Sequence, residues 1–208
     1  ISPYQIGVEG NLSIEGWTYG EVVNKPVGVT LDDDTNALLG TATATFKYEY
    51  KLSSEGSAYT TTAPTDAGDY TVRLTISVNN NFKNYTATAN FTIEKDELTF
   101  GDATGVLGWT WGDNTIPEHN GLIPAATYGT NEGEKVSSFT YTYYKAENCA
   151  ISGDALTGTP SDAGNYILRV SVSEGDNYKA GSKDYSFTVK QGQASISIKI
   201  EGADNWGY

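Results

Sequence analysis

Apolar and polar residues alternate along several stretches of the chain, which is the pattern of half-buried β-strands. The clearest stretches are residues 70–78 and 166–173, and a polar turn joins each to a second alternating stretch, residues 87–93 or 185–189. The alternation predicts one buried face per pair of strands, formed by Tyr70, Val72, Leu74, Ile76, Val78, Ala87, Ala89, Phe91 and Ile93 in the first pair and by Tyr166, Leu168, Val170, Val172, Tyr185, Phe187 and Val189 in the second. It also predicts that Ile167 and Arg169 face outward. We therefore expect a hairpin in each half of the chain.

These hairpins belong to an internal repeat, which indicates a tandem array of modules. The repeated segments are Gly16–Gly20 and Gly108–Gly112, Phe46–Tyr50 and Phe139–Tyr143, and Pro64–Tyr70 and Pro160–Tyr166. We expect one repeat over residues 1–95, a second over 96–190, and the first strand of a truncated third over 191–208. Because no Pro- or Ser-rich linker separates the repeats, we expect a short, stiff connection between neighbouring modules.

Composition supports an all-β fold and excludes several functions. The 208 residues lack long helix-period stretches and are rich in residue types that suit a pleated surface. The net charge of −13 disfavours nucleic acid as a partner. The single cysteine, Cys149, forms no internal disulfide, and we expect it to be a partly buried small apolar residue. No apolar run is long enough to cross a bilayer, and we expect the chain to be a segment of a longer polypeptide.

The segment Asp-Ala-Gly-[Asp/Asn]-Tyr before an alternating strand resembles the tyrosine corner of immunoglobulin-like sandwiches. The order W-x-[YW]-G, aromatic strand, P-[ST]-D-A-G-x-Y, N-Y and F-T-[IV] resembles the glycine-rich, mostly-β (MBG-type) bacterial Ig-like repeats of cell-surface proteins. The resemblance implies disulfide-free tandem sandwiches in which each tyrosine hydroxyl bonds to the backbone upstream. It assigns the corner roles to Asp66, Gly68 and Tyr70, and to Asp162, Gly164 and Tyr166. A β-grasp-type repeat with one helix is the alternative fold.

Paired aromatic residues in the Trp-x-aromatic-Gly motif are candidates for ligand binding. Trp17 with Tyr19, and Trp109 with Trp111, are two residues apart, so each pair shares one face of a strand. An exposed pair would form a platform on which a sugar ring could stack. Burial of the pair at the end of its own module, or at the seam with the next, is the alternative. The chain ends in a third partial motif, residues 206–208.

The acidic stretch at residues 32–36 resembles the start of a calcium-binding loop. Asp32, Asp34 and Asn36 would supply alternate oxygen ligands. The pattern then fails, because Ala37 replaces the turn glycine and Thr43 replaces the bidentate glutamate. The sequence therefore favours a solvated acidic loop over a metal site.

No set of catalytic residues stands out, and we expect no enzymatic activity and no cofactor. The only histidine, His119, lies far from Cys149 in a loop punctuated by Pro and Gly, so a Cys-His pair is not supported. An isopeptide cross-link from Lys47 is disfavoured because alternation places Lys47 on the outward face.

The repeated residues are explained by corners, cores and hairpins, and the resemblance implies a bacterial cell-surface or secreted repeat protein such as an adhesin. We therefore expect structural spacer modules of such a protein. Neighbouring repeats are then the expected partners, and we expect no membrane contact in this segment. A module that binds carbohydrate or a host or cell-surface protein is the alternative.

Overall fold

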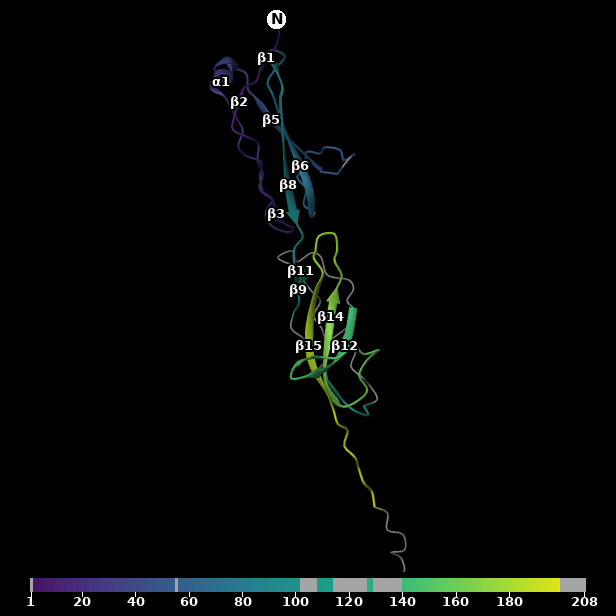
Figure 1. Cartoon of the computed structure of the whole chain (residues 1–208). Coiled ribbons are helices and arrows are strands. Elements are labelled where there is room, and N and C mark those ends of the chain that lie inside the picture. Colours follow the sequence, from purple (N-terminus) through teal and green to yellow (C-terminus); the bar gives the residue numbers. More distant parts are fainter. Residues whose placement is uncertain (1, 55, 102–107, 114–126, 129–139, 199–208) are drawn as a thin grey trace, which may run out of the picture. The chain divides into compact units, whose positions relative to one another are not determined.

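The chain is mostly β-structure with one short helix and divides into two compact units (Figure 1). The computed structural model describes residues 2–54, 56–101, 108–113, 127–128 and 140–198. The first unit comprises residues 1–100, 125–138 and 172–181, and the second comprises 101–124, 139–171 and 182–208. The predicted predominance of β-strands is confirmed.

The main sheet of the first unit has four strands in the order β3-β8-β6-β5. Their bounds are Trp17–Thr18, Tyr85–Glu94, Gly68–Ser77 and Thr45–Leu52. Strands β6 and β8 pair antiparallel as the predicted hairpin, and β5 pairs antiparallel with β6. The short β3 runs parallel to β8, with Trp17 opposite Ile93.

Alternate residues of β6 and β8 form the core of the first unit, as the sequence pattern predicted. Val72, Leu74 and Ile76 are completely buried, and Phe91 and Ile93 of β8 are 6% and 1% exposed. Burial of one such side chain contributes about 1.5–3 kcal/mol relative to its exposure. The hairpin is therefore the main source of hydrophobic stabilisation in this unit.

The edge strand β5 contributes less to this core. Tyr50 is 8% exposed, whereas Phe46 and Leu52 are 37% and 47% exposed. Only part of this aromatic strand is thus buried. Lys47 points outward, as expected, and its Nζ lies 2.8 Å from Glu49 Oε1.

Three pairs of two-residue strands complete the β-structure of the first unit. They are parallel β1 (Tyr4–Gln5) and β7 (Phe82–Lys83), antiparallel β2 (Val8–Glu9) and β4 (Thr30–Leu31), and antiparallel β9 (Leu98–Thr99) and β11 (Thr127–Tyr128). Ile6, between β1 and β2, is 2% exposed and joins Leu74 and Ile76 in the core. Strand β1 and Ile6 therefore lie beside the turn end of the β6–β8 hairpin.

Helix α1 (Asp33–Leu39) occupies the stretch for which the sequence favoured an acidic loop, so that expectation was wrong. It lies at the end of the first unit that carries β1 (Figure 1). Asp32 caps it by accepting a hydrogen bond from Thr35 N–H at 2.8 Å. The Thr35 side chain is completely buried, and its hydroxyl bonds to both backbone groups of Gly7. The cap and this buried anchor explain why so short a helix forms.

The sheet of the second unit has the order β10-β15-β14-β12-β13. The strands span Trp109–Thr110, Gly181–Lys190, Gly164–Val172, Thr140–Glu147 and Ala150–Ser152, and the terminal residues Gly181 and Val172 are assigned to the first unit. Strand β10 runs parallel to β15, with Trp109 opposite Val189. This pairing is the same as that of Trp17 with Ile93 in the first unit.

Alternation predicted most of the core of the second unit, although Val172 is only half-buried. Tyr166, Leu168 and Val170 are buried as expected. Ile167 was expected to face solvent but is only 3% exposed, which corrects the prediction. It lies opposite Tyr144 of β12, so a large cross-strand neighbour stands on the face that the pattern assigned to water.

Cys149 is exposed, which corrects the expectation of a partly buried residue. It lies in the turn between β12 and β13, after Asn148. The φ angles of Asn148 and Cys149 are 50° and 63°, as in the type I′ turns that suit two-residue hairpin connections. The hairpin geometry therefore fixes the position of this thiol at the surface.

Candidate functional site

Three aromatic rings form a stack in the core of the first unit. Phe91 lies between Trp17 and Tyr70, with ring centroids 5.2 Å and 5.6 Å apart and interplanar angles of 22° and 24°. Tyr50 meets the Phe91 ring edge-on at 6.3 Å. The stack ties the Trp-x-aromatic motif to the tyrosine corner, since Phe91 contacts a residue of each.

The second unit contains the same stack. Phe187 lies 5.3 Å from Trp109 and 5.7 Å from Tyr166, with interplanar angles of 28° and 26°. Tyr143 meets Phe187 edge-on at 6.2 Å. The residues repeated in the sequence thus make the same internal contacts in both units.

Each corner tyrosine donates its hydroxyl to the backbone four residues upstream. Tyr70 Oη lies 3.0 Å from Asp66 O, and Tyr166 Oη lies 2.9 Å from Asp162 O. Burial raises the pKa of both phenols above the ordinary value. The resemblance implies a bond from each hydroxyl to the upstream backbone, and the structure contains such a bond with the aspartate carbonyl as its acceptor.

The glycines of these motifs differ in what they permit. A Cβ on Gly16 would lie 2.3 Å from Thr92 O, and one on Gly108 would lie 2.4 Å from Thr188 O. A side chain before the tryptophan would therefore push β3 or β10 off its partner strand. At the corner glycines a Cβ would lie 3.5 Å from the Tyr70 ring at Gly68 and 3.4 Å from the Tyr166 ring at Gly164, but the φ angle of 154° at Gly68 is one that residues with a side chain rarely adopt.

The first tryptophan of each motif is buried and therefore cannot form part of a platform for ligands. Trp17 is 6% exposed and Trp109 is 8% exposed, so neither ring is open to a sugar. Tyr19 is half-buried, whereas Trp111 is 58% exposed. Of the four aromatic residues proposed as platforms, only Trp111 presents a largely open ring. The third partial motif lies outside the described residues.

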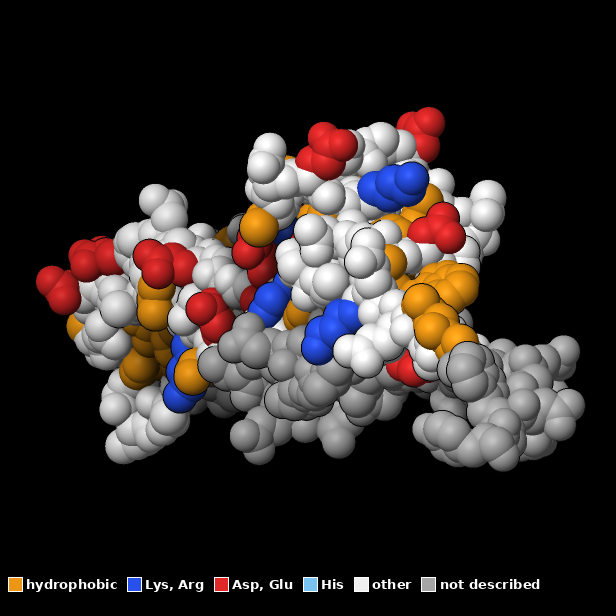
Figure 2. Space-filling view, turned by 90° about the horizontal axis from the view of Figure 1, so that it is seen from below, with side chains coloured by type: hydrophobic (Ala, Val, Ile, Leu, Met, Phe, Trp, Pro, Cys, Tyr) orange, Lys and Arg blue, Asp and Glu red, His pale blue; other side chains and the backbone are white. Residues whose placement is uncertain are grey.

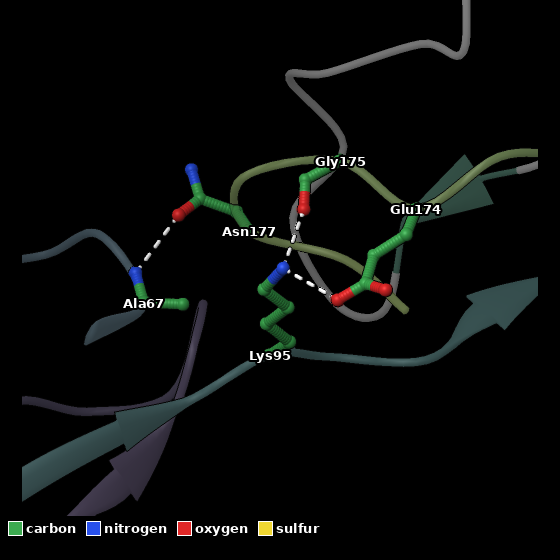
Figure 3. A network of polar contacts seen from close by, with 5 residues as sticks. All are labelled: Ala67, Lys95, Glu174, Gly175 and Asn177. Carbon is green, nitrogen blue, oxygen red and sulfur yellow. Dashed lines mark hydrogen bonds and ion pairs between the residues drawn. The ribbon is translucent and has the colours of Figure 1, made fainter. Parts of the chain in front are cut away.

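The first unit contains a loop that covers Tyr19. The Tyr178 ring meets the Tyr19 ring edge-on, with centroids 5.2 Å apart, and Tyr178 is 5% exposed. The same loop places Asn177 beside the tyrosine corner, where Asn177 Oδ1 accepts a hydrogen bond from Ala67 N–H at 2.8 Å (Figure 3). Asn177 Nδ2 also donates to Asp66 Oδ1 at 3.2 Å.

A lysine holds the other side of this loop. Lys95 Nζ lies 2.6 Å from Glu174 Oε1 and 2.9 Å from Gly175 O (Figure 3). The ammonium group lowers the pKa of Glu174 below its ordinary value. Sequence analysis missed these contacts, because the N-Y element of its motif order is Asn84-Tyr85 in the first repeat and Asn177-Tyr178 in the second, and the motif order makes the two equivalent.

Backbone contacts give a different correspondence. Asp96 N–H donates to Asn177 O at 3.0 Å, and Tyr4 N–H donates to Asn81 O at 2.8 Å. Asp96 forms a parallel bridge to Tyr178, as Tyr4 does to Phe82. Asn177-Tyr178 therefore corresponds to Asn81-Phe82, and the sequence signal for this was the equal spacing within the two hairpins.

The residues considered for calcium have other roles in the structure. Asp32 caps α1, hydrogen bonds from Thr35 lower the pKa of its carboxyl group, and Asn36 donates its side-chain amide to Leu31 O at 3.2 Å. Asp34 lies in the first turn of the helix. Among the described residues, no group of three or more His, Cys, Asp or Glu side chains could hold a metal ion.

Each repeat has a shallow cleft beside its tyrosine corner, and the two linings differ. The cleft of about 360 Å³ in the first unit has an apolar lining that includes Tyr50, Leu52 and Pro64. The cleft of about 230 Å³ in the second is lined mainly by polar groups, among them Thr157 and Ser161. Because the linings differ, the two clefts do not form one repeated ligand site.

Charged side chains on the outer strand faces form local pairs. Glu49 lies 2.8 Å from both Lys47 and Arg73, and these cations lower the pKa of its carboxyl group. The Arg73 guanidinium also lies 3.9 Å from the centroid of the Tyr59 ring. In the second unit Arg169 pairs with Asp184 at 2.7 Å. Figure 2 shows acidic side chains scattered over the face in view, with Lys and Arg among them.

The described residues include no helix that is both long and apolar enough to cross a membrane. His119 lies outside the described residues. The chain matches no protein-family model, and no curated protein matches it.

Proposed function

We propose that the two repeats are structural spacer modules of a bacterial cell-surface or secreted repeat protein. The observation that carries this proposal is the use of the repeated residues. In both units the Trp-Phe-Tyr stack and the tyrosine corner engage them in internal contacts. Residues selected for a ligand would instead present exposed groups at the same place in each repeat.

We further propose that each repeat is a disulfide-free Ig-like module. The antiparallel order β8-β6-β5 and the corner at the start of β6 support this assignment. Helix α1 favours the alternative, a β-grasp-type repeat. An experimental structure of the first repeat that contained a second sheet facing β8-β6-β5 would decide for the sandwich.

A spacer must hold its ends at a fixed separation, and this property can be measured. Cys149 is exposed and is the only cysteine, so it offers a native site for a spin label. A second label at Thr88→Cys, on the outward face of β8, would report the distance between the units. Double electron–electron resonance is expected to give one narrow distance distribution.

Singly labelled Thr88→Cys/Cys149→Ser and unsubstituted protein provide the controls for intermolecular signals. A broad distribution in the doubly labelled chain, with both singly labelled samples featureless, would contradict the spacer proposal. Such a result would mean that the repeats move freely and transmit no fixed length.

The alternative is a binding module for carbohydrate or for a host or cell-surface protein. Exposure of Trp111 is the observation that favours it, since an open indole is suited to stacking on a sugar ring. Titration of soluble glycans against the unsubstituted chain and Trp111→Ala tests this alternative. Saturable binding that the substitution abolishes would support a glycan-binding role for the second repeat.

A further inference from the structure

A loop of the first unit packs on a surface, here called the occupied receptor, that is formed by Tyr19, Asp66 and Ala67. The Tyr19 ring packs against Tyr178, the Ala67 N–H binds Asn177, and the Asp66 carboxylate accepts from the same side-chain amide. An asparagine followed by an aromatic residue is therefore what this surface recognises.

The second unit presents the same set of groups in an exposed state. Trp111 is 58% exposed, and Asp162 and Ala163 are exposed. We call these three residues the Trp111 surface. They correspond in chain order and in role to Tyr19, Asp66 and Ala67.

Shared backbone contacts place these groups alike in the two units. Trp111 N–H donates to Lys190 O at 2.7 Å, as Tyr19 N–H donates to Glu94 O at 2.9 Å. The Trp109-Phe187-Tyr166 stack then fixes the strand that carries Trp111 relative to the corner that carries Asp162 and Ala163. The Trp111 surface therefore shares the backbone and stacking contacts that position the occupied receptor.

The complementary element is exposed at the turn of the first repeat's hairpin. Residues 79–83 form this turn, which we call the first-repeat tip. Asn81 is exposed and Phe82 is half-buried, with its ring 6.0 Å from that of Tyr4. The backbone bond and the parallel bridge described above make Asn81-Phe82 the counterpart of Asn177-Tyr178.

We propose that the Trp111 surface binds the first-repeat tip of a second copy of this chain. The Asn81 amide would bond to Ala163 N–H and to the Asp162 carboxylate, while the Phe82 ring packs against Trp111. This inference rests on the proposed function, because it treats the repeats as modules that join end to end.

Charge matching supports this choice of occupant. In the occupied receptor Lys95 is paired with Glu174. By the same correspondence, the Trp111 surface has Gln191 beside it and the first-repeat tip has Val78. Both charges of this pair are therefore absent together. Lys83 of the tip, the counterpart of Lys179, would meet Gln193 in place of Glu97.

The Trp111 ring, which is larger than the Tyr19 ring, has space because the residue beside it is small. Residue 192 is glycine, and a Cβ there would lie 3.1 Å from Trp111 Cε3 and 2.7 Å from Trp111 O. At the corresponding position of the first repeat, where the ring is the smaller Tyr19, the residue is Asp96.

The association is expected to be weak between separate molecules and to be head-to-tail. The contact consists of one aromatic pair and two or three hydrogen bonds, so we expect a dissociation constant on the order of 1 mM. Modules joined in one chain experience an effective concentration in the same range, so this affinity suffices there. A head-to-tail contact that does not close a ring produces linear chains of molecules.

Two complementary variants isolate the proposed contact by NMR. The labelled partner is ¹⁵N-labelled Asn81→Ala, which keeps the Trp111 surface and lacks the tip amide. The unlabelled partner is Trp111→Ala, which keeps the tip. Addition of this partner to about 1 mM, near the expected dissociation constant, should shift the Ala163 amide and Trp111 indole signals, with amplitudes that grow with concentration.

Two unlabelled controls sharpen the test. Asn81→Ala/Trp111→Ala lacks the tip amide and is expected to reduce the shifts at least threefold. Asn84→Ala/Trp111→Ala should retain them, because Asn84 lies outside the proposed contact. Absence of shifts with every partner, or equal shifts with and without Asn81, would overturn the proposal. The result is independent of the spin-label distances, so the spacer proposal can fail or stand separately.

Discussion

The two repeats have the same interior and different exteriors. Phe91 and Phe187 stand at the centres of matching ring stacks, and the two corner tyrosines make matching bonds. On the outer faces, however, Arg73 pairs with Glu49 whereas its counterpart Arg169 pairs with Asp184. The repeated residues therefore specify the fold, and any ligand specificity must come from groups that differ between the repeats.

Removal of the central phenylalanine ring is expected to cause the largest loss of stability in each repeat. Phe91→Ala and Phe187→Ala should each lower the free energy of unfolding of their own repeat by about 3–5 kcal/mol, because each leaves a cavity between two rings. Urea unfolding followed by residue-resolved amide signals would report each repeat separately. If one repeat lost less than about 1 kcal/mol, its ring stack would not have the same role as the stack of the other repeat.

The tyrosine corners provide a smaller and more specific test. Tyr70→Phe and Tyr166→Phe should each destabilise their repeat by about 1–3 kcal/mol, since the buried tyrosine loses its hydrogen bond to the aspartate carbonyl. The same urea experiment gives both values. Unchanged midpoints in both repeats would show that the corners contribute nothing to stability, contrary to the account.

Helix α1 is tested in the first repeat alone, since the aligned stretch of the second repeat lies largely outside the described residues. Asp32→Ala should destabilise the first repeat by about 1 kcal/mol through loss of the N-cap. Because the Asp32 carboxylate caps the helix, added calcium should not change the melting temperature of the unsubstituted chain. A calcium-dependent rise that Asp32→Ala abolished would instead revive the metal site.

The smallest effect is expected on the outer face, from the carboxylate of Glu49. Its pKa lies below the ordinary value of 4.5 because Lys47 and Arg73 stabilise the charged form. The ion pair therefore adds stability above pH 4.5 and loses it as the pH falls through the lowered pKa. Glu49→Gln should be less stable than the unsubstituted chain near neutral pH, and the difference should shrink at pH 3, about a unit and a half below the ordinary value. A difference that persisted at pH 3 would assign the effect to packing.

Periodicity predicted the hairpins well because burial on one face imposes a strict alternation. It failed at Ile167, where Tyr144 lies opposite on the face expected to meet water. It also missed α1, because seven residues are too few to establish a helical period and the Thr35 anchor depends on Gly7, which is distant in sequence.

The candidate site was less predictable than the fold. The motif alone could not distinguish buried Trp109 from exposed Trp111, since the two are neighbours but differ in their contacts. The pairing of Tyr19 with Tyr178 required the register of the hairpin, which the apparent match between two Asn-Tyr pairs obscured. Exposure at such positions follows from tertiary contacts, and the local sequence does not encode it.

Acrylamide quenching measures directly whether the repeated tryptophans Trp17 and Trp109 are buried. Trp111→Phe/Trp206→Phe retains only Trp17 and Trp109 as tryptophans. The account predicts that their fluorescence is poorly quenched and does not respond to a panel of soluble glycans. Strong quenching of these two residues, relieved by a particular glycan, would contradict it and make the repeated motif a binding platform.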